Sequence, residues 1–347
     1  MKTISKILYV LLSIYSFIFV NSILAKDSAL EHMDELIFLT EGVAKESLRY
    51  IQLIAKPDPP QPANNSISKI VDLVEQTEKR VQVTTPFKEN ESFKNAVMNY
   101  LSGISLLFLV RYSPFEQLLF DANKNKSSEY KLSYLLTKRE ASTVLYTNEQ
   151  IFLEAKNKFA IENNVHYLEK ENANSFRLRN AAEALNYHEN LYVENFYIYL
   201  TEAHLLYAIQ SENVIDIEKR RLALIQLSDH MFSILEKHPV YKNDGSLILS
   251  YRKNLAFYQK ESTEDVPFFV ELILQKERFN RFKKRFGKMS RSEKTKEDLN
   301  QYKELQADLV QLIQKCDQIE KRLKTERSLL RIQWEKANKE FLIKFVL

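Results

Sequence analysis

Scarcity of glycine is the feature that most constrains this chain. Its 347 residues include only four glycines: Gly42, Gly103, Gly245 and Gly287. A β-rich chain of this length needs many tight turns, and tight turns favour glycine because they require positive φ. Hydrophobic residues make up 45% of the chain, which supplies a core and is not the composition of a disordered protein. The sequence therefore predicts an all-α protein with long helices and few connections.

Apolar residues at intervals of three and four indicate where those helices lie. In the first half, we expect helices at 27–56, 66–84, 91–111 and 132–168. A polar stretch at 169–187 joins the halves and is also expected to be helical. In the second half, we expect helices at 188–211, 214–237, 246–260, 268–286 and 297–345.

The last helix carries a heptad seam typical of a coiled coil. The seam is formed by Leu305, Leu309, Leu312, Cys316, Ile319 and Leu323. Glu326 and Arg327 interrupt it, which favours packing within its own bundle over a free dimer. Cys316 is the only cysteine, so no internal disulfide is available, and its place in an apolar stripe predicts a buried, inert thiol.

Proline spacing indicates an internal duplication. Pro86 and Pro114 lie 28 residues apart, and so do Pro239 and Pro267. Because proline begins or ends helices, equal spacing implies equal helix lengths. Coincidence between generic helices is the alternative. We predict two tandem up-down helical bundles, at residues 26–168 and 169–347. The second has longer C-terminal helices, and its extra length follows Pro267.

The first 25 residues read as a secretory signal. Lys2 and Lys6 precede an apolar run, Ile7–Val20, whose 14 residues fall short of the ~20 needed to span a bilayer. We predict cleavage after Ser22 or Ala25, and therefore a protein of the periplasm, the cell surface or the medium. An uncleaved N-terminal membrane anchor is the alternative.

Motifs that carry site chemistry are missing from the sequence. It contains no Glu-x-x-His pair for a carboxylate-bridged metal, no glycine-rich phosphate loop and no Gly-x-Ser-x-Gly. The nearest approach, Glu202 with His204, places the two side chains on different helix faces. We therefore predict no catalytic residue, no metal and no cofactor, and a non-enzymatic protein. A hydrolase that uses scattered carboxylates is the alternative.

A basic stretch at 276–296 is the strongest surface signal. Its cations include Lys276, Arg278, Arg281, Lys283, Lys284, Arg285, Lys288 and Arg291. Phe279, Phe282 and Phe286 are interleaved at helical spacing, so one side is aromatic and the other basic. In an exported protein this pattern points to anionic lipid, lipopolysaccharide or an acidic partner rather than to nucleic acid. A solvated helix end whose phenylalanines pack in their own core is the alternative.

Residues 86–164 resemble an uncharacterised family of exported helical surface proteins of the leptospiral type. The resembling residues are Pro86, Phe87, Lys88, Phe93, Lys94, Ala96, Tyr100, Phe152, Ala155, Phe159 and Ala160. The resemblance implies a helical bundle in the cell envelope and supplies no catalytic residue. The second bundle would be an addition to the single-bundle pattern of that family.

Three functions are compatible with these features. The leading hypothesis is a non-enzymatic envelope or secreted protein that binds a protein or envelope partner. The second is a membrane-active protein that uses the basic stretch, with the apolar run Leu101–Val110 as either a core helix or a membrane-inserting hairpin. The third is a small-molecule sensor or carrier with a ligand between its helices. The sequence leaves the partner and the oligomeric state open.

Overall fold

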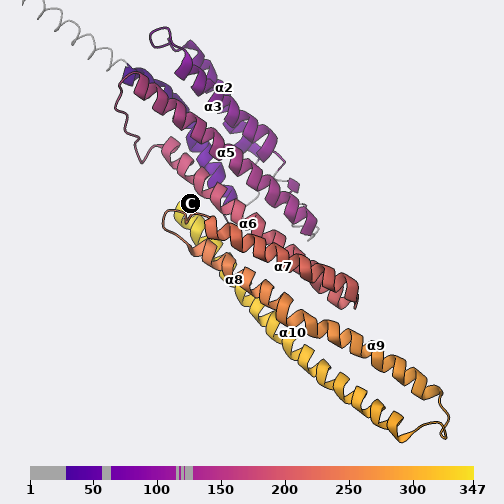
Figure 1. Cartoon of the computed structure of the whole chain (residues 1–347). Coiled ribbons are helices and arrows are strands. Elements are labelled where there is room, and N and C mark those ends of the chain that lie inside the picture. Colours follow the sequence, from indigo (N-terminus) through magenta and orange to yellow (C-terminus); the bar gives the residue numbers. More distant parts are fainter. Residues whose placement is uncertain (1–28, 57–63, 115–116, 119–120, 122–127) are drawn as a thin grey trace, which may run out of the picture. The chain divides into compact units, whose positions relative to one another are not determined.

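The computed structural model describes residues 29–56, 64–114, 117–118, 121 and 128–347 (Figure 1). Within these residues the chain forms helices and no strand, apart from two isolated bridges in tight turns. The prediction of an all-α protein is confirmed. The predicted signal segment and the whole proline-rich segment at 57–62 lie outside the described residues.

The described chain begins in a helix that runs from residue 29 to residue 54. The elements that follow are α2 (Asn64–Val83), α3 (Ser92–Leu106), the π-helix η1 (Leu107–Tyr112), α5 (Ser128–Glu162), α6 (Asn174–Gln210), α7 (Val214–Lys237), α8 (Ser246–Lys260), the π-helix η2 (Glu261–Asp265), α9 (Val266–Lys288) and α10 (Lys296–Phe345). Helices α7 and α8 have the predicted bounds, and α9 and α10 lie within two residues of theirs.

Three stretches differ from the prediction. Residues 261–267, expected to separate two helices, are helical, because η2 and α9 continue from α8 without a break. Helix α5 ends at Glu162 rather than at residue 168, because Asn164 adopts a φ of 52° and the N–H of Val165 donates to the carbonyl of Ala160 at 2.8 Å. This left-handed residue closes the helix. Helix α6 is a single helix of 37 residues, because the joining stretch is helical from Asn174 and continues into the next helix without a break. Residues 169–173, also expected to be helical, are not.

The chain divides into two compact units. Unit 1 contains the described residues up to Glu189 together with Leu342–Leu347, and unit 2 contains Asn190–Phe341. Helices α6 and α10 each contribute to both units. The predicted repeat boundary at residue 168 thus precedes the boundary between the compact units, which falls inside α6.

Aromatic side chains fill much of the core of unit 1. The Tyr50 ring lies 5.2 Å from that of Phe108 and 5.1 Å from that of Tyr112, measured between centroids. Phe93 stacks on Phe159 at 4.9 Å. Edge contacts such as the first two and stacked contacts such as the third add to the free energy gained by burying the rings. They join the N-terminal helix to η1, and α3 to α5.

The apolar run Leu101–Val110 is buried on one side only. Its buried residues are Leu101, Ile104, Leu107 and Phe108. Its exposed apolar residues are Leu106, Leu109 and Val110. The helical stretch Ser92–Tyr112 that contains it is the one segment among the described helices long and apolar enough to cross a membrane, and 39% of its most apolar window is buried. Its inner side is therefore part of the core of unit 1.

In unit 2, α9 and α10 run side by side as a long hairpin (Figure 1). The seam residues Leu305, Cys316, Ile319 and Leu323 are buried. Cys316 lies against α9, with its sulfur 3.4 Å from the carbonyl of Phe268, and burial raises the pKa of its thiol. The seam predicted from the heptad pattern thus packs within the unit.

Two tight turns with the same backbone geometry precede α3 and α8. In the first, the N–H of Asn90 donates to the carbonyl of Phe87 at 2.9 Å; in the second, Asp244 donates to Tyr241 at 2.7 Å. The central residues of both turns have positive φ: Lys88 (49°), Glu89 (64°), Lys242 (42°) and Asn243 (64°). Each turn leads into an α-helix of 15 residues that continues as a π-helix.

Candidate anionic-surface site

The far end of the α9–α10 hairpin has a small core of its own. Phe279 and Phe282 of α9 and Leu305 of α10 form a buried cluster, and Phe286 and Tyr302 pack against it. The Tyr302 ring lies 5.4 Å from each of Phe279 and Phe286. We call residues 276–305 the basic arm.

Helical spacing explains why the aromatic residues of α9 face α10. Positions 279, 282 and 286 are separated by three and four residues, so they lie along one side of the helix. The structure places all three side chains in the arm's own core, as the alternative interpretation of the basic stretch predicted. They are therefore used for folding, and the arm presents no aromatic face for insertion into lipid.

The basic side chains lie on the rest of the α9 surface. Lys276 is an exception, since it is half-buried and its Nζ pairs with a carboxylate oxygen of Glu212 at 2.7 Å. The other cations predicted for this site are exposed: Arg278, Arg281, Lys283, Lys284, Arg285, Lys288 and Arg291. Arg278, Arg281, Arg285 and Lys288 alternate spacings of three and four and form a row about 15 Å long.

Acidic side chains near the end of the arm are mostly used to shape the chain. The Asp298 carboxylate accepts the backbone N–H of Thr295 at 3.2 Å and its hydroxyl at 2.9 Å, a cap for the start of α10. Glu293 accepts the N–H of Ser290 at 2.7 Å in the connecting turn. Arg285 reaches Asp298 only at 3.9 Å. From residue 276 to 303, eleven basic residues face four acidic ones, so the arm keeps a strong positive charge.

Two cations rest on aromatic rings of the arm. The Arg285 guanidinium lies 4.7 Å from the Phe282 ring centroid, and Lys294 lies 4.6 Å from that of Phe286. Contacts of this kind are weakly stabilising at exposed sites. They hold the two charges close to the arm, whereas Arg278, Arg281, Lys283, Lys284 and Lys288 are exposed on α9.

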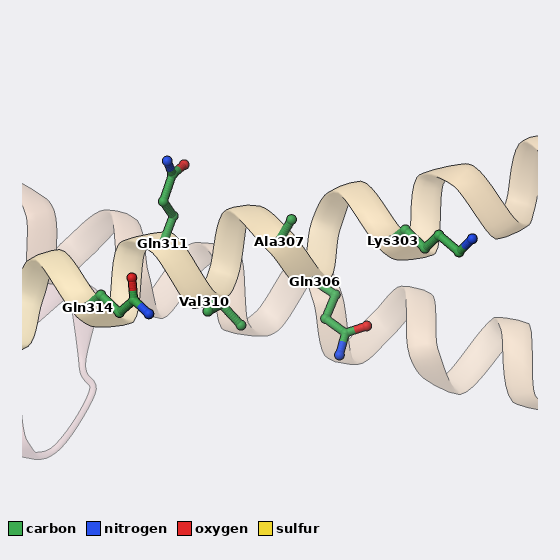
Figure 2. Close-up of a pocket in the computed structure, with 6 residues that line it drawn as sticks. All are labelled: Lys303, Gln306, Ala307, Val310, Gln311 and Gln314. Atoms are coloured by element: carbon green, nitrogen blue, oxygen red, sulfur yellow. The ribbon is translucent and has the colours of Figure 1, made fainter.

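A hollow on α10 offers little to a small molecule. Figure 2 shows its lining residues spread along one side of a single helix. They are Lys303, Gln306, Ala307, Val310, Gln311 and Gln314. All six are exposed. Because binding sites for small molecules enclose most of their ligand, this surface gives the carrier hypothesis no support.

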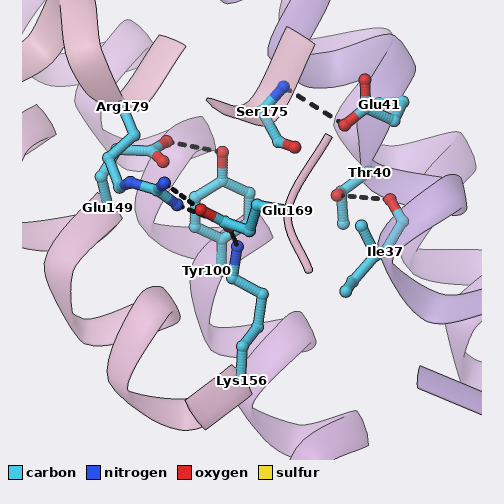
Figure 3. A network of polar contacts seen from close by, with 9 residues as sticks. All are labelled: Ile37, Thr40, Glu41, Tyr100, Glu149, Lys156, Glu169, Ser175 and Arg179. Carbon is cyan, nitrogen blue, oxygen red and sulfur yellow. Dashed lines mark hydrogen bonds and ion pairs between the residues drawn. The ribbon is translucent and has the colours of Figure 1, made fainter. Parts of the chain in front are cut away.

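Unit 1 contains a buried charged network that was missed in the sequence (Figure 3). The Tyr100 hydroxyl donates to the Glu149 carboxylate at 2.8 Å. Close by, the Glu169 carboxylate accepts from Lys156 at 2.6 Å and from Arg179 at 2.7 Å. Burial raises the pKa of Glu149 to about 7. No short sequence pattern indicated this network, since its members come from separate helices and a loop.

Unit 2 contains a second network, centred on two arginines of α10. Arg327 pairs with both Glu202 of α6 and Glu261 of η2. Arg322 pairs with Asp265, also of η2. The sequence held one signal for this network, because charged residues that interrupt an apolar seam need buried partners.

In comparisons with known proteins, no family model, no curated protein and no solved structure matches this chain. Across the described residues, no group of three or more His, Cys, Asp or Glu side chains is arranged to hold a metal ion. The basic arm and the buried networks are therefore the candidate functional features of the described chain.

Proposed function

We propose that this protein is an exported, non-enzymatic binding protein of the cell envelope that holds an anionic lipid surface through its basic arm. One observation carries the proposal: the aromatic residues of α9 pack in the arm's own core, while most of the arm's cations remain exposed. Such an arm attracts phosphate-rich surfaces without inserting into them.

The expected binding is electrostatic and additive. Each Lys or Arg close to an anionic membrane surface contributes about 1 kcal/mol, and the attraction falls off within a Debye length of about 8 Å at physiological salt. Several exposed cations on one arm therefore give useful affinity only together. This predicts reversible, salt-sensitive, peripheral binding.

The predicted export favours anionic lipid over nucleic acid as the partner of the basic arm. The basic start and apolar run of residues 1–25 support an address outside the cytoplasm, where anionic lipid headgroups and lipopolysaccharide are more accessible than nucleic acid. The resemblance of residues 86–164 to leptospiral-type surface proteins fits the same location and stays a prediction. An acidic protein partner is the competing possibility.

A vesicle-binding experiment tests the proposal. The full chain is mixed with vesicles of zwitterionic lipid, with and without an anionic phospholipid, and cosedimentation is measured at rising salt. The Arg281→Glu, Lys284→Glu variant should bind anionic vesicles at least about 30-fold more weakly, because two contributions of about 1 kcal/mol are lost and then reversed.

Lys336→Glu with Lys339→Glu is the matched control. Both lysines are exposed on α10 outside the arm, and the pair changes the net charge by the same amount. This control should bind nearly as well as the natural chain. Equal losses in the two variants, or binding that salt does not weaken, would rule out the arm as the contact surface.

We further propose that the chain is an internal duplication of one helical bundle. The matched turns before α3 and α8 support it, because four non-glycine residues with positive φ at corresponding positions are an uncommon coincidence. The following helices have equal length, and each is extended by a π-helix. Phe87 contacts Phe159 just as Tyr241 contacts Phe341.

A further inference from the structure

The two π-helices follow helices of equal length but bury side chains of different chemistry. In η1 the buried residues are apolar or aromatic: Leu107, Phe108 and Tyr112. In η2 they are polar or charged: Glu261, Ser262 and Asp265. Because π-helices are rare and often occur at functional sites, a charged lining in one unit alone points to a specialised role there.

The charges at η2 do not balance when both glutamates are ionised. Arg327 is the shared partner of Glu202 and Glu261, and the two carboxylates are buried at 2% and 1% exposure. Two carboxylates with one guanidinium leave one buried negative charge, which is strongly unfavourable. In addition, Oε2 of Glu261 is buried and has no hydrogen-bond partner among the described residues. One bound proton would remove the excess charge.

These contacts also attach the basic arm to the rest of unit 2. Helix α9 continues directly from η2, and α10 returns past it. Arg327 and Arg322 of α10 both pair with η2. Arg221 of α7 lies on the other side, with its guanidinium 3.4 Å from the carbonyl of Ser262. The charged site thus lies where the two helices of the arm are joined to the bundle.

We propose that Glu202 and Glu261 share one proton and, with Arg327, form a proton-dependent clamp that holds α10 against η2. Burial and the neighbouring Glu202 together raise the pKa of Glu261 to about 8, although Arg327 lowers it. Burial also raises the pKa of Glu202. Loss of the shared proton leaves the second buried charge uncompensated and loosens the clamp. The inference does not depend on what the arm binds.

Arg327 and Tyr258, which interact with both carboxyls, keep a fixed charge where the pair titrates. Arginine stays protonated throughout, and burial holds the pKa of Tyr258 well above its ordinary value. The charged or titratable groups that interact with both carboxyls are Arg327 of α10 and Tyr258 of α8. Arg322 of α10, Asp265 of η2 and Arg221 of α7 make neighbouring contacts at η2.

The direction of the pH effect follows from the raised pKa. A carboxyl whose pKa is higher in the closed clamp than in the open one keeps its proton longer when the clamp is closed. The closed form is therefore most favoured below the ordinary carboxyl pKa of 4.5, and it loses that advantage as the pH rises toward about 8. For one proton, the opening equilibrium rises up to tenfold per pH unit in this range.

Hydrogen exchange of the full chain between pH 6 and pH 9 tests the clamp. After correction for the intrinsic exchange rate, amides of η2 and of residues 320–330 should open up to tenfold more per pH unit until about pH 8. Glu261→Gln and Glu202→Gln each replace one of the two carboxyls by a neutral amide, so that no shared proton is needed. Either variant should therefore flatten the pH dependence of opening. Glu335→Gln changes an exposed carboxyl on α10, the helix that carries Arg327. This variant should leave the pH dependence unchanged.

Two results would overturn the clamp. One is a natural chain whose η2 and 320–330 amides show no pH dependence beyond the intrinsic rate. The other is a glutamine variant that folds and keeps the natural slope. The two variants change different helices, so a folding defect in one leaves the other informative, and the measurement on the natural chain needs neither.

Discussion

Glu149 and Glu189 show how neighbouring side chains determine whether a buried carboxyl is ionised. Both are buried in unit 1. Glu149 has the hydroxyl of Tyr100 as its hydrogen-bond partner, and burial raises its pKa to about 7. Burial alone would also raise the pKa of Glu189, but Lys138, at 2.9 Å, and His188 lower it to about 2. The cation in direct contact outweighs the loss of solvation.

The two residues have opposite effects on stability. Glu149 has a higher pKa in the folded chain than the ordinary 4.5, so its contribution is complete below pH 4.5 and is lost as the pH rises to about 7. Glu189 has a lower pKa when folded, so its contribution is complete above pH 4.5 and is lost as the pH falls toward about 2.

The substitution Glu149→Gln tests the first of these effects. The natural chain should lose on the order of 1 kcal/mol of unfolding free energy per pH unit from this residue between pH 5 and pH 7. The glutamine variant cannot titrate, so its urea unfolding curves should show a shallower pH dependence. Glu154→Gln, an exposed position on the same helix, is the control. Parallel pH profiles for all three proteins would contradict the assignment.

At the scale of elements, two glycines inside helices differ in whether a side chain would fit in their place. Gly42 lies inside the N-terminal helix, and a Cβ added there would meet no atom within 4 Å. At Gly103 of α3, the same Cβ would lie 2.6 Å from Oδ1 of Asn148, whose amide donates to the carbonyl of Tyr100 at 3.2 Å. Alanine is therefore accommodated freely at one position and meets a hydrogen-bonded side chain at the other.

We expect Gly42→Ala to stabilise the protein by about 1 kcal/mol, the usual difference between alanine and glycine inside a helix. Gly103→Ala should gain less or be destabilising, because Asn148 must move and give up its hydrogen bond. Thermal unfolding of the two variants beside the natural chain measures the difference. A larger gain at Gly103 than at Gly42 would show that Asn148 yields without cost.

Helices could be predicted well from the sequence because their signals are local. The bounds of α7 and α8 followed from the spacing of their apolar residues. The end of α5 was placed too late, although the asparagine at 164 is a residue that tolerates the left-handed conformation which closes the helix. The packing of the arm's phenylalanines was anticipated as an alternative because it also depends on helical spacing.

The π-helices and the buried networks could not be predicted in the same way. A π-helix has no strong local signature, and the residues of η2 fall between the two helices predicted at 246–260 and 268–286. The contact between Arg327 and Glu202 joins positions 125 residues apart. Only the fold brings them together, so the sequence could indicate an interrupted seam but not its partner. The basic arm was found because its charge is contiguous in the chain.

At the scale of the whole molecule, the net charge is small but the charges are unevenly distributed along the chain. The chain as a whole carries +4, whereas eleven cations and four anions lie between residues 276 and 303. Net charge alone would suggest no preference for anionic partners. The field of a protein depends on how its charges are distributed, and here much of the excess lies on one arm.

Export of the chain can be tested at its N-terminus. If residues 1–25 are a cleaved signal, intact mass and N-terminal sequencing of the protein from its native cells should give a chain that starts at Ile23 or Lys26. Leu12→Arg places a charge in the apolar run and should prevent both cleavage and export, because the run must enter a hydrophobic environment. Ser5→Arg adds the same charge to the basic start and should be tolerated. A chain that keeps Met1 but still fractionates with membranes would instead favour the uncleaved anchor, and the basic arm would then act on a protein already held at the bilayer.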